Sequence, residues 1–216
     1  MFQPPIATVS LRVGAGAARA QGEIYNFFSS QLTLDRSDFR GFAYAADLSV
    51  RVAPRVDIGV GFAYDHSSTP SEFKDWTDQN DNPIEQTTEL RRLPLSVNAR
   101  YYLLSRGRSV AQHAWVPFRF TPYVTAGGGL MLYKLIQNGD WVNTQTLDIF
   151  SHRFESSGAG GMLNAGAGTE WWLTPTLGLT AEARYAWGSA TLERDFDFDR
   201  IDLSGLQLTT GLAVRF

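Results

Sequence analysis

The sequence contains no cysteine, almost no lysine and no long apolar run. Without cysteine there can be no disulfides, cysteine–metal sites or thiol nucleophiles. Of the 19 basic residues, only Lys74 and Lys134 are lysine, and the other 17 are arginine. Because lysine is usually a water-exposed residue, this indicates little ordinary solvent-facing surface. The longest apolar stretch, residues 126–133, is far shorter than the ~20 residues of a membrane-spanning helix.

Charge of either sign is also sparse. Charged residues make up 19% of the chain, below the roughly 25% of ordinary soluble domains. The formal net charge is -3, so the chain lacks the basic surface that nucleic-acid phosphates require, and we expect no nucleic-acid partner. The 44% of hydrophobic residues argues against disorder. A length of 216 residues suits one domain, which we place over residues 1–216.

In place of helical periodicity, the chain has long runs in which apolar residues alternate with small or polar ones, which is typical of strands. We predict eight strands, at residues 6–17, 41–52, 56–65, 92–104, 122–134, 162–173, 177–188 and 206–216. The predicted connections alternate between long and short, with long ones at 18–38, 66–88, 135–158 and 189–204. Only the connection at 105–119 is long where a tight turn is expected. Long loops at one end and tight turns at the other are typical of transmembrane β-barrels.

The composition of the two strand faces indicates which of them points outward. The polar face consists of Gly, Ala, Ser, Asn and Thr with isolated charges, which suits the crowded lumen of a barrel of eight strands. The apolar face carries aromatic residues near strand ends, as membrane interfaces do: Tyr44, Phe62, Tyr64, Tyr101, Trp171, Tyr185, Trp187 and Phe216. We predict an all-β fold, an eight-stranded antiparallel up-and-down transmembrane β-barrel. The alternative is a soluble barrel or sandwich.

Nine charged residues fall on the predicted lumen face. An isolated charge would be energetically costly in the lumen. Because the numbers of positive and negative side chains are nearly equal, we expect them to form ion pairs. Arginine suits such a network because its planar group can bond a carboxylate through two atoms. The predicted network contains five cations and four anions: Arg12, Arg51, Arg100, Arg184, Arg215, Asp47, Asp57, Glu170 and Glu182. A salt-bridged closed lumen is the first interpretation, and a narrow gated ion path is the alternative.

Three segments resemble those of known membrane barrels. The last strand, 206–216, alternates and ends in Phe216, and Tyr101-Tyr102 and the segment 121–129 also match. The chain resembles the small outer-membrane β-barrel superfamily of the OmpA transmembrane domain, OmpX and OmpW. The resemblance implies a bacterial outer-membrane location, with periplasmic termini and extracellular long loops. It also implies Phe216 as the signal for the barrel-assembly machinery, and outer-membrane lipid and lipopolysaccharide as partners of a monomer.

We predict a structural or surface-interaction role, with no enzyme activity, cofactor or metal. An OmpW-like passage of small apolar solutes is the first alternative. A lipid-modifying enzyme is the second, because His66 and Ser68 lie two residues apart and so share a strand face. A His-x-Ser pair of this kind resembles that of outer-membrane lipid A deacylases. Its orienting carboxylate is a guess between Asp65 and Glu72.

The loop from Asp78 to Glu89 nearly matches the oxygen-ligand spacing of a calcium loop. Pro83 stands where that loop needs glycine, and the flanks are strands, so we interpret it as a solvated acidic loop. The connections 66–88 and 189–204 are both acidic and contain aromatic residues. Divalent cations could join these carboxylates to lipopolysaccharide phosphate.

Overall fold

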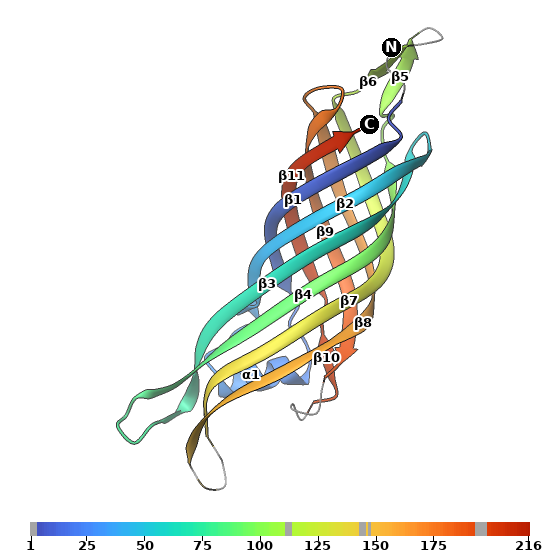
Figure 1. Cartoon of the computed structure of the whole chain (residues 1–216). Helices are drawn as coiled ribbons and strands as arrows, with labels where there is room; N and C mark the ends of the chain where they lie inside the picture. The colour runs from blue at the N-terminus through green and yellow to red at the C-terminus, as the bar shows by residue number, and fades with distance from the viewer. Residues whose placement is uncertain (1–3, 111–113, 143–145, 147, 193–197) are drawn as a thin grey trace.

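A computed structural model describes residues 4–110, 114–142, 146, 148–192 and 198–216. Eight antiparallel strands form a closed ring (Figure 1). In chain order these are β1 (Ala7–Ala18), β2 (Arg40–Ala53), β3 (Val56–Thr77), β4 (Pro83–Tyr102), β7 (Phe120–Val142), β8 (Ile149–Trp172), β9 (Leu177–Thr191) and β11 (Gly205–Arg215). Each pairs with its successor, and β11 pairs with β1 from Thr8↔Arg215 to Ala18↔Gly205. The predicted fold class is confirmed, and the ring has no free edge within its barrel section.

Shorter elements connect the strands of the ring. The connection 105–119 forms a hairpin of β5 (Gly107–Val110) and β6 (Ala114–Pro117), and β10 (Arg200–Asp202) pairs with the end of β9. The two termini and the hairpin lie at one end of the barrel, which we term the termini end (Figure 1). Helix α1 (Glu23–Gln31) and β10 lie at the opposite, long-loop end.

Two predicted loops are in fact strand. Residues 66–72 of β3 pair with 85–91 of β4, and β7 and β8 stay paired out to Val142↔Ile149. The predictions of loops at 66–88 and 135–158 are therefore wrong over most of their length. The reason is chemical: beyond residue 66 the outward face becomes polar, so the apolar alternation that marks a lipid-facing strand disappears while the backbone pairing continues.

The predicted long connection at 18–38 joins β1 to β2, but part of it has regular structure that was not predicted. Helix α1 occupies part of it, and a short 3-10 turn, η1 (Arg36–Asp38), follows. Ile24, Tyr25 and Phe28 share one buried face of the helix, at the spacing expected of an amphipathic helix. No helix among the described residues is both long enough and apolar enough to span a membrane.

The outer wall of the ring is apolar. Val97 and Leu212 are 58% and 52% exposed, and Leu95 and Leu179 also face outward. Exposed aromatic residues lie toward the two ends of this band: Phe42, Tyr44 and Phe62 toward the long-loop end, and Tyr101, Phe120, Trp171 and Phe216 toward the termini end. A continuous exposed apolar surface closed on itself is the outer face of a membrane barrel.

Replacement of Val97 by arginine tests that assignment. We expect it to lower the free energy of unfolding from lipid bilayers by about 2–4 kcal/mol, because the charge would lie in hydrocarbon. The matched control is Ser68→Arg, on the same outward parity but beyond the apolar band, which should change stability little. Equal effects of both substitutions in bilayer refolding assays would contradict the placement of the band.

Candidate functional site

The centre of the lumen holds a buried cluster of four charged side chains from three strands. Arg184 Nη2 lies 3.0 Å from Asp47 Oδ1 and 2.7 Å from Glu182 Oε1. Arg12 contacts Asp47 as well and lies 3.3 Å from Glu182 Oε1. All four residues are buried, and the inward parity of β1, β2 and β9 directs them to the axis. Each charge is therefore compensated by an opposite charge on another strand or two residues away on the same strand.

A second layer lies next to it, toward the termini end. Arg100 Nη1 is 2.9 Å from Glu170 Oε1, and the Tyr102 hydroxyl donates to the same carboxylate oxygen at 3.1 Å. The Tyr123 hydroxyl donates to Glu182 Oε2 at 2.8 Å, which joins the two layers. The Arg100 guanidinium also lies over the Tyr123 ring, 4.2 Å from its centroid, in a cation–π contact.

The termini end is closed by two more arginines. Arg106, from the connection before β5, reaches into the lumen and contacts Asp57 Oδ2 at 2.8 Å. Arg215 lies 3.7 Å from the ring centroid of Trp172, and its Nε donates to the Pro175 carbonyl at 2.7 Å. Aromatic faces and a backbone carbonyl thus solvate Arg215 in place of a carboxylate.

The structure brings seven of the nine predicted network residues into ion pairs: Arg12, Asp47, Asp57, Arg100, Glu170, Glu182 and Arg184. Within the described part of the chain, neither Arg51 nor Arg215 forms an ion pair, so the predicted direct pairing does not extend to these two residues. Arg51 lies opposite Asp57 in the β2–β3 register but is only partly buried, close to the rim where water can solvate it. Arg215 has the aromatic partners just described.

Sequence reasoning missed three members of the lumen network. Arg92 Nη2 lies 3.2 Å from Asp65 Oδ2, and both residues are buried. Both occupy the inward parity of their strands, so the alternation pattern could have identified them. Arg106 could not have been found in this way, because it belongs to a connection with no parity.

An apolar plug fills the lumen at the long-loop end. Residues of the 18–39 connection pack inward against the barrel wall and the segment around β10. We define the plug by its inserted side chains: Ile24, Tyr25, Phe28, Leu32, Leu34 and Phe39. The Tyr25 hydroxyl donates to the Asp202 carbonyl at 2.9 Å, and the Tyr25 and Phe39 rings meet edge to face at 5.0 Å. The lumen is therefore occupied by an apolar core at one end and by paired charges through the rest.

Outside the barrel, a small polar cluster lies where β3 and β4 leave the apolar band. His66 Nε2 is 2.6 Å from Glu89 Oε1, and Arg91 Nε donates to that same oxygen at 2.7 Å. Ser68 lies directly opposite Glu89 in the β3–β4 register, on the same outward face as His66. Burial raises the pKa of Glu89, but hydrogen bonds from Arg91 and His66 outweigh it and hold that pKa below its ordinary value.

The structure replaces both guesses for the carboxylate beside His66. Asp65 points into the lumen, where it contacts Arg92 and accepts a hydrogen bond from Gln207 at 2.8 Å. Glu72 lies opposite Glu85, six residues beyond His66 on β3. Glu89 could not be recognised from the sequence, because its approach to His66 depends on the register of a strand pair in a segment that the sequence predicts to be a loop.

The acidic loop tip is an Asx turn. Asp78 accepts hydrogen bonds from the backbone of Asn80 and Asn82, both at 2.7 Å, and from the Asn82 side chain at 3.0 Å. The bonds from Asn82 and Asn80 lower the pKa of the Asp78 carboxyl. Among the described residues no group of three or more His, Cys, Asp or Glu could hold a metal ion. Glu193, Asp195 and Asp197 of the other acidic connection lie outside the described residues.

No protein-family model and no curated protein matches this sequence. Among solved structures, Neisserial surface protein A matches with a TM-score of 0.50 and 13% identity, over 98% of this chain and 97% of that one. Ail of Yersinia pestis matches at 0.48 and 12%, over 99% and 100% of the two chains. OprG of Pseudomonas aeruginosa matches at 0.47 and 13%, over 98% and 97%.

The closed ring of eight strands, its apolar outer wall and the match to Neisserial surface protein A define the class: the chain has the fold of the small outer-membrane β-barrels. The predicted resemblance is confirmed at the level of the fold. At such identities the matches show architecture, and the role has to come from this chain's own residues.

Proposed function

We propose that this protein is an integral protein of a bacterial outer membrane, with a closed lumen and a structural or surface-contact role. Its apolar band suits hydrocarbon, and its strand extensions and α1 lie at the end opposite the termini. In this proposal the termini face the periplasm, and the long-loop end is extracellular. The protein acts as a monomer that contacts outer-membrane lipid and lipopolysaccharide. The exposed Phe216 side chain at the end of β11 is available to the barrel-assembly machinery.

The filled lumen carries this proposal. Buried ion pairs from Asp57–Arg106 to Asp65–Arg92 occupy the axis, and the plug covers the long-loop end. A solute would have to separate paired charges in a poorly hydrated interior, which is energetically unfavourable. The same observation argues against passage of small apolar solutes through the axis, the alternative raised by the sequence. The surfaces left for function are the outer wall and the extracellular strand extensions.

Proteoliposome swelling tests the closed state. We expect liposomes containing the wild-type protein to take up small sugars no faster than protein-free liposomes do. A porin reconstituted at the same protein-to-lipid ratio is the positive control. Sugar-dependent swelling by the wild-type protein would refute a closed lumen and support a transport role.

One specific observation favours a second candidate function, hydrolysis of a lipid ester at the outer rim. Glu89 contacts His66 Nε2, and Ser68 lies two residues along β3 on the same outward face, directly opposite Glu89. An oriented histidine beside a serine hydroxyl is the arrangement that activates a nucleophile. In this candidate Ser68 Oγ attacks the ester carbonyl and His66 takes its proton, which then passes to the departing alcohol. Water hydrolyses the acyl-enzyme and releases a fatty acid.

Fatty-acid release from micellar acylated glycolipid tests this second candidate. If Ser68 is the nucleophile, Ser68→Ala should remove the activity, and Glu89→Gln should lower kcat by about 10²–10⁴-fold through loss of the oriented base. Ser67→Ala, on the inward face of the same strand, is the matched control and should retain activity. Wild-type protein that releases no more fatty acid than protein-free micelles would eliminate the candidate and leave the closed-barrel proposal intact.

A further inference from the structure

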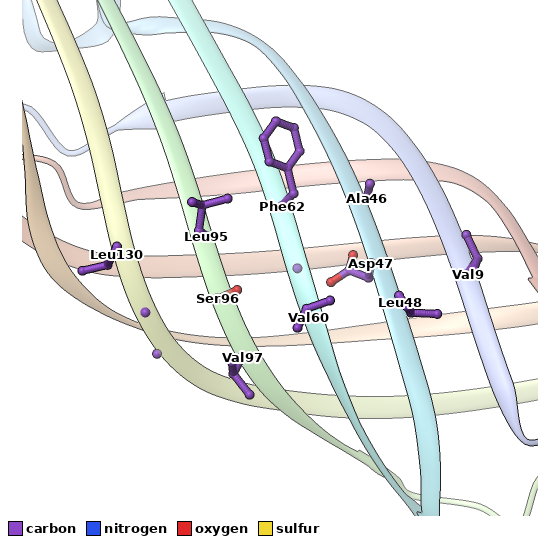
Figure 2. A pocket seen from close by; sticks show the side chains of 13 residues that line it. Val9, Ala46, Asp47, Leu48, Val60, Phe62, Leu95, Ser96, Val97 and Leu130 are labelled. Atoms are coloured by element: carbon purple, nitrogen blue, oxygen red, sulfur yellow. The ribbon is translucent and has the colours of Figure 1, made fainter.

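The outer wall has a depression on the strands below the His66 cluster. It has a volume of about 560 Å³ and lies over β1, β2, β3, β4 and β7. Small residues form its floor, since Ala46 and Gly128 take outward positions between larger neighbours. Figure 2 shows Phe62, Leu95 and Leu130 projecting around it from three neighbouring strands. The depression is therefore an apolar trough several strands wide.

Basic residues line the boundary above this trough. Four positions nearer the long-loop end, the strands of Phe62, Leu95 and Leu130 carry His66, Arg91 and Lys134 on the same outward parity. These three lie side by side, because His66 pairs with Arg91 and Arg91 with Lys134 in the strand register. Four residues of strand correspond to about 13 Å, within one bilayer leaflet. The row thus lies where a lipid headgroup would be if acyl chains occupied the trough.

The row and its neighbour Arg153 together hold one more permanent cation than carboxylates. Glu89 contacts His66 and Arg91, while Glu155 contacts Lys134 and lies 3.3 Å from Arg153 Nη2. The three permanent cations Arg91, Lys134 and Arg153 therefore face two carboxylates. The Arg91 and Lys134 side chains remain 43% and 37% exposed, so both retain N–H donors for an external anion.

A second depression provides an internal comparison. It measures about 480 Å³ and lies on the opposite wall, around Val13, Ala167, Ala183 and Leu208. Four positions toward the long-loop end, those strands carry Ala17, Leu163, Trp187 and Ser204, none of them charged. At that distance only the first of these two troughs has cations above it, so a generic packing hollow does not account for the combination.

We infer that the wall of β1 to β7 is a binding site for a multiply acylated, phosphate-bearing glycolipid of the outer leaflet. The acyl chains lie in the trough, and the phosphates are bound by Arg91 and Lys134, with His66 beside them. The breadth of the site sets this ligand apart from a two-chain lipid with one phosphate, because His66 and Lys134 are two strand spacings apart, about 10 Å. The inference rests on the outer-membrane location in the proposed function, but not on a closed lumen.

Lipid retention in native mass spectrometry tests the site. Purified protein in neutral detergent is titrated with bis-phosphorylated lipid A, with the same glycolipid lacking phosphate, and with phosphatidylglycerol. We expect the wild type to bind the bis-phosphorylated lipid about tenfold or more tightly than either comparison lipid. The R91Q/K134Q variant should lose that preference. The R19Q/R200Q variant loses the same charge from other long-loop-end positions and should keep it.

Filling the trough tests the acyl-chain part. Ala46→Trp should reduce binding of the bis-phosphorylated lipid A, while Ala181→Trp, in the second depression, should not. Equal affinity for all three lipids would overturn the inference, and so would equal losses in the two charge variants or unchanged binding in Ala46→Trp. None of these outcomes bears on sugar permeability, so failure here is distinguishable from failure of the closed-lumen proposal.

Discussion

Replacement of Glu182 by leucine is expected to destabilise the barrel by about 3–5 kcal/mol, because it leaves buried cations without their counter-charge. Glu182 contacts Arg12 and Arg184 and accepts a hydrogen bond from Tyr123, so one substitution removes partners from both layers of the network. Urea unfolding in detergent micelles, followed by tryptophan fluorescence, measures the change.

A paired substitution separates the cost of an orphaned charge from the value of the pair. Glu170→Leu alone should cost about 3–5 kcal/mol, since Arg100 loses its nearest carboxylate, 2.9 Å away. The double variant Arg100→Met/Glu170→Leu should cost less than Glu170→Leu alone, because no buried charge remains unpaired. A double variant that is less stable than the single one would show that the arginine is not dependent on its ion pair.

Replacement of Phe28 by alanine is expected to cost about 3–5 kcal/mol, the usual range for removing a buried phenylalanine. Phe28 is 1% exposed and packs against Tyr25 and Phe39 within the plug. The cavity would loosen α1 from the lumen, so limited proteolysis of the 18–39 connection should become faster. The exposed Gln31→Ala on the same helix is the matched control. Proteolysis at the same rate in both variants would mean that α1 is not held by its apolar face.

The sequence predicted the barrel because a lipid-facing strand has a strong periodic signature. Alternation at Leu95 and Val97 or at Leu179 fixes both the strand and its outward face, and these residues are exposed as expected. The apolar alternation ends where the strands leave the lipid-facing band. Beyond His66 both faces are polar or mixed, so the continuing β3–β4 pairing had no pattern to reveal it. Helix α1 was not predicted, because nine residues contain too few turns to show a clear helical periodicity.

The residues of the candidate sites also divide into those that strand alternation could predict and those that it could not. Parity placed Arg100, Glu170 and Glu182 in the lumen, and near-balance of charge implied their pairing, since a narrow barrel cannot hold unpaired ions. Which atoms meet depends on register, which composition does not determine. The contact between Glu89 and His66 joins residues 23 positions apart, and Arg106 enters the lumen from a turn. Both are tertiary features with no local signal.

Single-channel recording in planar bilayers tests the closed lumen most directly. The wild-type protein should give no stable conductance. The comparison is a variant in which residues 20–38 are replaced by a short glycine–serine turn and the ion-paired lumen residues by serine: Arg12, Asp47, Asp57, Asp65, Arg92, Arg100, Arg106, Glu170, Glu182 and Arg184. This variant lacks both the plug and the buried ion pairs, and it should conduct if it retains its heat-modifiable folded band on gels. Steady, nanosiemens-scale channels from the wild-type protein would contradict the account and identify the barrel as a pore.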